Sequence, residues 1–297
     1  MLEPIAFDRA RLRAGFDART DPQARADFLL AEIESRMFER LEPVRLAPAC
    51  ILELGCGLGR GLPTLLARFP GARCVAADFS FESLRAARRR EAALLDAGSG
   101  LRRWLARIGA AADPRPRPAA PQWLCCDAQA LPLAEASVDL VWSNLVAHWF
   151  DDPLAAVGEW YRVVRPRGLV MFSAFGVDTL REVPDSDPPS RPVFQDMHDW
   201  GDALSAAGFA DPVMETERLT LTFGDAAALA RDLDGLLAGL QPRSAAPPAG
   251  ASAPAEAGDF ARAVTIEVVY GHAWCPEAKR RDDGFEPLRF RPKPGAS

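Results

Sequence analysis

The sequence predicts an α/β fold, in which helices cover both faces of a parallel sheet. From residue 46 onward, short apolar runs typical of buried strands alternate with segments of helical periodicity. A glycine-rich turn joins the first run to the first helix. A polar residue also stands at or near the end of each of the first four runs: Glu53, Asp78, Asp127 and Asn144. Because ligands in such sheets bind at the carboxyl ends of the strands, we expect these four residues to share one site.

The pattern of residues 1–45 predicts an N-terminal helical cap. Apolar side chains recur there every three or four residues, as on an amphipathic helix. They are Phe28, Leu29, Ile33, Met37, Phe38 and Leu41. We expect this helix to cover an exposed face of the main domain. Pro43 and Pro48 precede the first strand, so we place the main domain at residues 46–275.

The turn Gly55–Gly59 is expected to bind a ligand through its main chain. Glycine adopts dihedral angles closed to other residues, and without a β-carbon it lets a ligand approach the backbone. The turn lacks the lysine of a P-loop and matches the G-x-G-x-x-G pattern of dinucleotide sites only loosely, through Gly61. Glu53 places a carboxylate beside the turn, which suits an amine-bearing ligand better than a pyrophosphate. The alternative is a glycine turn that binds nothing.

The second strand, residues 74–78, ends in an acid about 20 residues beyond Gly57, where α/β nucleotide folds bind ribose hydroxyls. This favours a ribose role for Asp78. The alternative for an acid at a strand end is a helix cap or turn residue, and Ser80 is itself a candidate cap for the next helix.

Residues 81–95 have a helical pattern rich in arginine, and residues 96–121 are rich in glycine and proline. We predict a partly flexible insertion at 96–121, between the second helix and the third strand. Arginines from Arg85 to Arg117 form a basic run in a chain whose net charge is -6. Most such runs are simply solvated, but this one is also a candidate surface for an acidic protein partner.

The third and fourth strands are expected at residues 123–127 and 138–144. His148 follows the fourth strand closely. A histidine here is either a base on the substrate side of the site or a residue that packs or caps a helix. The sequence leaves both alternatives open.

The remaining segments continue the alternation. A helix from Asp152 leads through Arg165–Gly168 into a fifth strand at 169–175, and a loop at 176–195 is expected over the site. Asp196 and Gly208 are expected to cap the next helix. Further elements are two final strands at 213–223 and 265–274, a helix at 225–240, a mobile linker at 241–258 and a polar tail at 276–297.

Composition sets limits on the function. The 297 residues suffice for one large core or two modest ones. The negative net charge argues against a general nucleic-acid binder. No apolar run approaches the roughly 20 residues that cross a bilayer, and the N-terminus has no secretory signal pattern. The six cysteines show no C-x-x-C spacing, so we expect free thiols and no metal site. A cytoplasmic monomer is the expectation.

The pattern of Glu53 followed by alternating glycines resembles motif I of the class I methyltransferases that use S-adenosyl-L-methionine (SAM). The resemblance implies a Rossmann-like seven-stranded fold with an N-terminal helical cap and lid insertions. It also implies that the acid and the glycine turn hold the methionine part of SAM, and that Asp127 contacts the adenine. The implied cofactor contacts are Glu53, Gly55, Cys56, Gly57, Gly59, Asp78, Phe79, Asp127, Ala128, Asn144 and Leu145.

Three further blocks resemble the malonyl-acyl-carrier-protein O-methyltransferases of biotin synthesis and their relatives: Phe7–Arg9 with 27–37, Asp196–Leu204 and Thr265–Trp274. The resemblance implies methylation of a malonyl carboxylate, which is ionised near neutral pH and needs no catalytic base. It also implies an acidic acyl-carrier protein as partner, met by the arginine-rich region 85–117. Alternatives are another acceptor, as in a related complex I assembly factor that hydroxylates arginine, or a non-catalytic assembly protein. Leu58, where threonine is frequent, departs from the family pattern.

Overall fold

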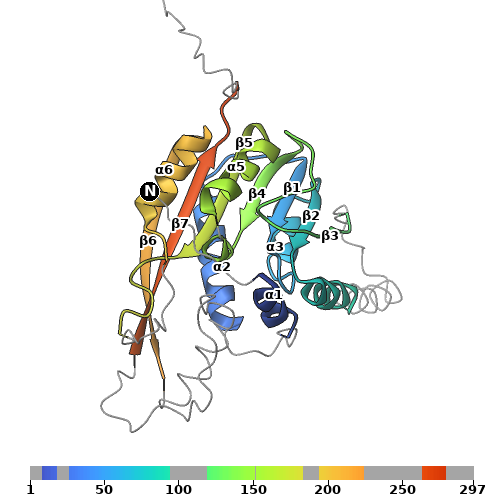
Figure 1. Ribbon diagram of the computed structural model, residues 1–297. Coiled ribbons are helices and arrows are strands. Elements are labelled where there is room, and N and C mark those ends of the chain that lie inside the picture. Colours follow the sequence, from blue (N-terminus) through green and yellow to red (C-terminus); the bar gives the residue numbers. More distant parts are fainter. Residues whose placement is uncertain are drawn as a thin grey trace, which may run out of the picture.

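The computed structural model describes residues 9–18, 27–93, 119–150, 152–182, 194–223 and 263–278. Through them runs a seven-stranded sheet in the order β3-β2-β1-β4-β5-β7-β6 (Figure 1). The strands are β1 (Cys50–Leu54), β2 (Arg73–Asp78), β3 (Gln122–Cys125), β4 (Val138–Ser143), β5 (Val164–Phe175), β6 (Ala210–Thr222) and β7 (Ala263–Trp274). β1 to β5 pair in parallel, and β7 runs antiparallel between β5 and β6. The predicted α/β fold with seven strands is confirmed.

Helices cover both faces of this sheet. They are α1 (Arg9–Asp17), α2 (Asp27–Leu41), α3 (Leu62–Arg68), helical residues 81–93, the short 3₁₀ helix η1 (Ala147–Trp149), α5 (Pro153–Val163) and α6 (Met197–Ala207). One hydrophobic cluster joins α1, α2 and α3 to the sheet, and a second joins α5 and α6 to its other face. The N-terminal helices therefore share a core with the sheet.

The two faces follow from the alternation of side chains along each strand. In β1, Ile51 belongs to the cluster under α1, α2 and α3, whereas Leu52 belongs to the cluster under α5 and α6. Glu53 is two residues beyond Ile51 and pairs in register with Trp142 of β4. Its side chain is therefore expected on the face that α2 covers.

The helix ends on the second face confirm the predicted caps. The Asp196 carboxylate accepts a hydrogen bond from the amide of His198 at 2.8 Å, which satisfies a free donor in the first turn of α6. Gly208 ends the helix with φ of +105°, a left-handed angle that glycine adopts without strain.

Several boundaries differ from the sequence prediction. β5 begins at Val164, five residues earlier than expected, because residues around Arg167 (φ +65°) bulge out of register with β4 and then rejoin it. β3 ends at Cys125, so Asp127 lies in the following loop. Phe28 is 56% exposed, whereas the rest of its apolar stripe faces the core. α1, which the sequence did not distinguish, is a separate helix.

Other predictions fall outside the described residues. They are most of the insertion at 96–121, the helix at 225–240, the linker at 241–258 and most of the tail at 276–297. In the part of the chain that is described, no helix has the length and apolar character needed to span a bilayer. The described residues also contain no cluster of metal-binding side chains, and all six cysteines are free thiols.

Candidate functional site

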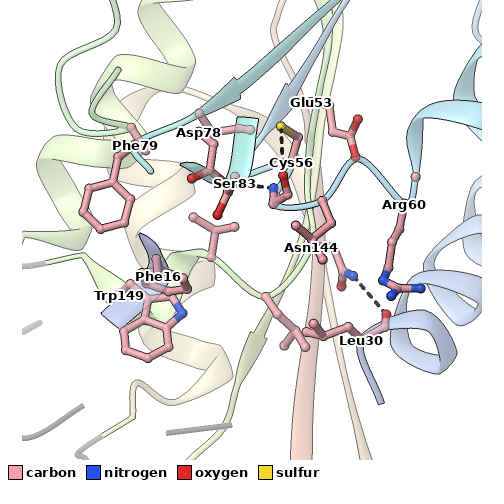
Figure 2. Close-up of a pocket in the computed structure, with 18 of the residues that line it drawn as sticks. Phe16, Leu30, Glu53, Cys56, Arg60, Asp78, Phe79, Ser83, Asn144 and Trp149 are labelled. Atoms are coloured by element: carbon pink, nitrogen blue, oxygen red, sulfur yellow. Dashed lines mark hydrogen bonds between the residues drawn. The ribbon is translucent and has the colours of Figure 1, made fainter. Parts of the chain in front are cut away.

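A cavity of about 230 Å³ opens at the carboxyl ends of β1 and β4, where the strand order reverses. All predicted cofactor contacts except Gly59 line it: Glu53, Gly55, Cys56, Gly57, Asp78, Phe79, Asp127, Ala128, Asn144 and Leu145. Figure 2 shows Glu53 and Arg60 at one end of this cavity and Phe16, Phe79 and Trp149 at the other. The acids at the strand ends therefore do share one site.

The glycine turn lies along the cavity wall with its main chain exposed to it. The amides of Gly55 and Cys56 donate to the carbonyl of Ala77 at 2.7 and 2.9 Å, which ties the turn to the end of β2. A β-carbon added at Gly57 would meet no atom of the described residues within 4 Å, so among them the backbone faces open space. Gly59 differs, because a β-carbon there would press against Leu62 at 3.0 Å. It serves the packing of α3 in this structure.

Asp78 braces the turn from the end of β2. Its carboxylate accepts hydrogen bonds from the amides of Gly57 and Ser80, both at 2.8 Å. Burial raises its pKa above the ordinary value, although these two bonds oppose the rise. Ser80 accepts a hydrogen bond from Ser83 N at 3.0 Å and so caps the helix at 81–93. The bonds to Gly57 and Ser80 correspond to the turn-residue alternative for Asp78, and its ribose role stays a prediction.

Aromatic rings form the far wall of the cavity. Phe16 of α1 meets Phe79 and Trp149 edge to face, with ring centroids 5.5 and 5.1 Å apart. Arg9 of α1 lies over the ring of Phe79, 5.7 Å from its centroid, and forms an ion pair with Asp127, which therefore lies at this end. A flat apolar ring fits such a wall, and a carboxylate beside it can accept from an exocyclic amine.

Asn144 links the end of β4 to both neighbouring elements. Its amide nitrogen donates to the carbonyl of Leu30 on α2 at 3.2 Å, and its oxygen accepts from Ser173 of β5 at 2.7 Å. Ser173 in turn accepts from the amide of Leu145 at 2.9 Å. The side chain of Asn144 is therefore held in place, and Leu145 (φ +54°) is turned toward the cavity.

His148 lies in the core and is absent from the residues that line the cavity. It is 5% exposed, and its ring packs on Phe175 with centroids 4.5 Å apart. Nδ1 accepts a long hydrogen bond of 3.4 Å from the amide of Phe175. Burial lowers the pKa of His148 to about 3, so it is neutral near pH 7. These contacts match the packing alternative.

The sequence did not identify the contribution of the N-terminal helices to this cavity. α1 supplies Arg9, Leu12 and Phe16, and α2 supplies Leu30 and Glu34. Arg13 also donates to the carbonyl of Phe79, at 2.9 and 2.6 Å, and so ties α1 to the end of β2. In the sequence, the one signal of this contribution was Glu34, an acid that stands beside Ile33 within the apolar stripe of α2.

The residues present fit SAM on the chemistry of the cavity itself. Glu53 is 4% exposed, and its Oε2 has no hydrogen-bond partner among the described residues, which suits an ammonium group. Gly57 opens the wall to a bulky ligand, and the aromatic end suits an adenine. Among the described residues, the same cavity therefore offers a place for each part of the cofactor.

Comparison with known proteins also indicates a methyltransferase. Residues 52–172 match a family model described as a methyltransferase domain. A malonyl-acyl-carrier-protein O-methyltransferase of Laribacter hongkongensis is 39% identical, and the alignment covers 98% of this chain and 99% of the relative. The protein of the same name from Methylovorus sp. is 37% identical over 98% of this chain and 97% of its own length.

Solved structures show the same fold at low sequence identity. The N-methyltransferase NodS of Bradyrhizobium japonicum, in complex with S-adenosyl-L-homocysteine, is 14% identical with a TM-score of 0.51, over 90% of this chain and 100% of that chain. A phosphoethanolamine N-methyltransferase of Haemonchus contortus is 15% identical with a TM-score of 0.53, over 89% of this chain and 60% of that chain.

Proposed function

Because the chain belongs to the family of malonyl-acyl-carrier-protein O-methyltransferases, we propose that it methylates the free carboxylate of a malonyl group on an acyl-carrier protein, using SAM. This reaction masks a charge on a precursor in biotin synthesis. One observation carries the proposal beyond the similarity of sequence. The cavity at the switch in strand order combines an unpaired buried carboxylate, an open glycine turn and an aromatic wall.

We propose the following roles for the residues around the cofactor. Glu53 faces its ammonium group, and Gly57 leaves room for its chain beside the turn. Asp78 holds the turn and is the acceptor for ribose hydroxyls. Asp127 and the amide of Ala128 are placed for the adenine edge, which Phe79 covers. SAM supplies an electrophilic methyl group when it is bound.

The reaction needs positioning more than proton transfer. A malonyl carboxylate has an ordinary pKa of about 4 and is already ionised near pH 7. Catalysis then consists of holding the acceptor close to the methyl group and excluding water. No base is required, and the burial of His148 in the core agrees with this.

The carrier protein is proposed to dock on the helical residues 81–93. Arg85, Arg88 and Arg89 are exposed there, and Ser83 of the same helix lines the cavity.

Charge reversal in an Arg88→Glu/Arg89→Glu variant is expected to raise KM for the carrier substrate about tenfold at low salt and to leave SAM affinity unchanged. Arg45→Glu is the control, because Arg45 is exposed ahead of β1, whose amino end points away from the cavity. Equal KM values in both variants would contradict this surface.

The deciding experiment is a methyl-transfer assay with malonyl-acyl-carrier protein and SAM, with acetyl-carrier protein as the substrate that lacks the carboxylate. Methyl transfer to the malonyl form alone is the expected result.

Calorimetry with SAM tests the site separately. Gly57→Val places a branched side chain in the cavity at a φ of +50° and is expected to abolish binding. A folded Gly57→Val variant with unchanged SAM affinity would refute the assigned site.

A further inference from the structure

We propose that Glu34 of α2 joins Glu53 in binding the ammonium group of the cofactor, and that this pair of carboxyl groups releases a proton when the cofactor binds. The inference rests on the proposed function, because it concerns the same cavity. It assigns a role to a residue outside the glycine turn and the strand ends. It also makes cofactor affinity depend on pH.

The fold fixes Glu34 toward the sheet. It is 8% exposed, beside Ile33 on the buried stripe of α2. Trp142 of β4 donates from Nε1 to Glu34 Oε1 at 3.4 Å. The same indole stacks on Phe38, one turn further along α2, with centroids 4.4 Å apart. Packing on both sides therefore holds the carboxyl group where it lines the cavity.

Glu34 and Glu53 converge on one point of the wall. A β-carbon added at Gly61 would collide with Oε1 of Glu34 and would lie only 2.9 Å from Oε1 of Glu53. Two carboxyl groups thus occupy the space in front of Gly61, one from α2 and one from β1. This explains why residue 61 is a glycine although its backbone is not left-handed.

Among the described residues, no arginine, lysine or histidine forms an ion pair with Glu34 or Glu53. Glu53 Oε2 is buried without a hydrogen-bond partner among the described residues, and the bond from Trp142 to Glu34 is long. Buried carboxylates in proteins are ordinarily paired with a cation or hydrogen-bonded. In the part of the chain that the structure describes, the titratable groups that face the pair or the adjoining wall are Cys56, Arg60, Cys74, Asp78 and Arg90. Of these, Arg90 favours the charged form of Glu34, while Asp78 disfavours that of Glu53.

The protonation of the pair follows from this environment. Burial raises the pKa of Glu34 to about 7. Burial raises the pKa of Glu53 well above its ordinary value, and the nearby Glu34 and Asp78 add to the rise. A bound ammonium group favours the ionised forms, so binding below about pH 7 requires a carboxyl proton to leave for the solvent. Affinity for the cofactor is therefore expected to fall as the pH is lowered through 7.

The test is calorimetric titration with S-adenosyl-L-homocysteine, which keeps the ammonium group and is not consumed. Titrations near pH 6.5 in two buffers of different ionisation enthalpy count the protons released, expected to be about one per site. The comparison ligand is 5′-methylthioadenosine, which lacks the amino-acid part and is expected to release none. Neither measurement depends on activity.

Glu34→Gln keeps an oxygen for the Trp142 bond but carries no charge. This variant is expected to release fewer protons and to bind S-adenosyl-L-homocysteine about tenfold more weakly near pH 8, with the affinity for 5′-methylthioadenosine unchanged. Glu39→Gln, an exposed position on the same helix, is the matched control and is expected to behave as the wild type.

Each result decides between the alternatives. Tight binding with no proton release, or equal release in Glu34→Gln and wild type, would overturn the role of Glu34 and leave the proposed function intact. The pair would then be a proton-sharing contact between α2 and β1. If S-adenosyl-L-homocysteine and SAM both fail to bind near pH 8, the cofactor assignment itself fails, and this inference fails with it.

Discussion

At the scale of single residues, Glu34 and His148 are both polar groups buried in the protein, but only one of them lines the cavity. Glu34 meets a second carboxyl group in a space open to a ligand. His148 is surrounded by the rings of Trp149, Phe175 and Phe194 and accepts one hydrogen bond, from the backbone amide of Phe175. Burial alone therefore does not mark a functional residue here. Position relative to the cavity does.

Glu34 is expected to make the ligand-free protein less stable as the pH rises. Its folded-state pKa is about 7, against an ordinary value of 4.5, so the folded form binds more protons than the unfolded chain between these values. The stabilisation is complete below about pH 4.5 and is lost as the pH rises through 7. The free energy of unfolding of Glu34→Gln and of wild type is measured by urea denaturation without ligand. The difference in favour of the variant should be larger near pH 8 than near pH 5, by up to about 3 kcal/mol. An equal difference at both pH values would contradict this.

His148→Ala is expected to destabilise the protein without disabling the chemistry. Removing a buried ring leaves a cavity and should cost roughly 2–4 kcal/mol of unfolding free energy. Loss of a general base would lower the rate by about a hundredfold or more. The methyl-transfer rate at saturating substrates, measured well below the melting temperature, should instead stay within about threefold of wild type. A hundredfold loss of rate would restore the base alternative.

The sequence was most informative about residues whose role depends on local backbone geometry. Alternating glycines after a strand imply an open turn, and acids at strand ends share an edge of the sheet, so Gly57 and Asp78 were predictable. Arg9, Phe16 and Glu34 reach the cavity only because α1 and α2 dock over it. That docking depends on contacts with strands far along the chain, which no local pattern specifies.

At the scale of elements, helices and strands were predicted well where periodicity and caps agree. The buried strands and the caps of α6 are examples. The predicted start of β5 was wrong, because Arg165–Gly168 has the composition of a turn but joins the strand as a bulge. Composition does not distinguish a turn from a bulge, since both need residues that accept unusual dihedral angles.

Two glycines next to or within helices are expected to respond oppositely to alanine. Gly208→Ala puts a β-carbon at a φ of +105° and 3.0 Å from the ring of Tyr161, and should cost about 1–2 kcal/mol of stability. Gly158→Ala lies inside α5, where an added β-carbon meets no described residue within 4 Å, and should add about 0.5–1 kcal/mol of stability. Denaturant unfolding of both variants provides the check. Destabilisation by both substitutions would contradict the prediction for Gly158.

At the scale of the whole molecule, the N-terminal helices line the cavity as well as forming part of the core. α1 is held to the sheet by Arg13 on the carbonyl of Phe79 and by the Arg9–Asp127 ion pair. α2 is held by ion pairs from Arg36 and Arg40 to β6. The predicted picture of a cap over an exposed face did not include a role in the cavity.

Saturating S-adenosyl-L-homocysteine is expected to slow amide hydrogen exchange in α1 and α2, because these helices line the cavity that the ligand fills. α6 packs on the opposite face and lies outside the lining, so it is the internal reference. Mass-spectrometric exchange with and without ligand measures both. Protection that is equal in α1 and α6, or absent from α1, would contradict the assigned site.

The position of β7 also has a consequence for the order in which the protein forms during synthesis. β6 leaves the ribosome before β7, yet β7 lies between β5 and β6 and pairs with both of them. Until residues 263–274 have emerged, β5 has an open edge and β6 lacks its neighbour in the sheet. The nascent chain can therefore bring β1 to β5 together early, but its last strand must insert into the gap before the sheet is complete.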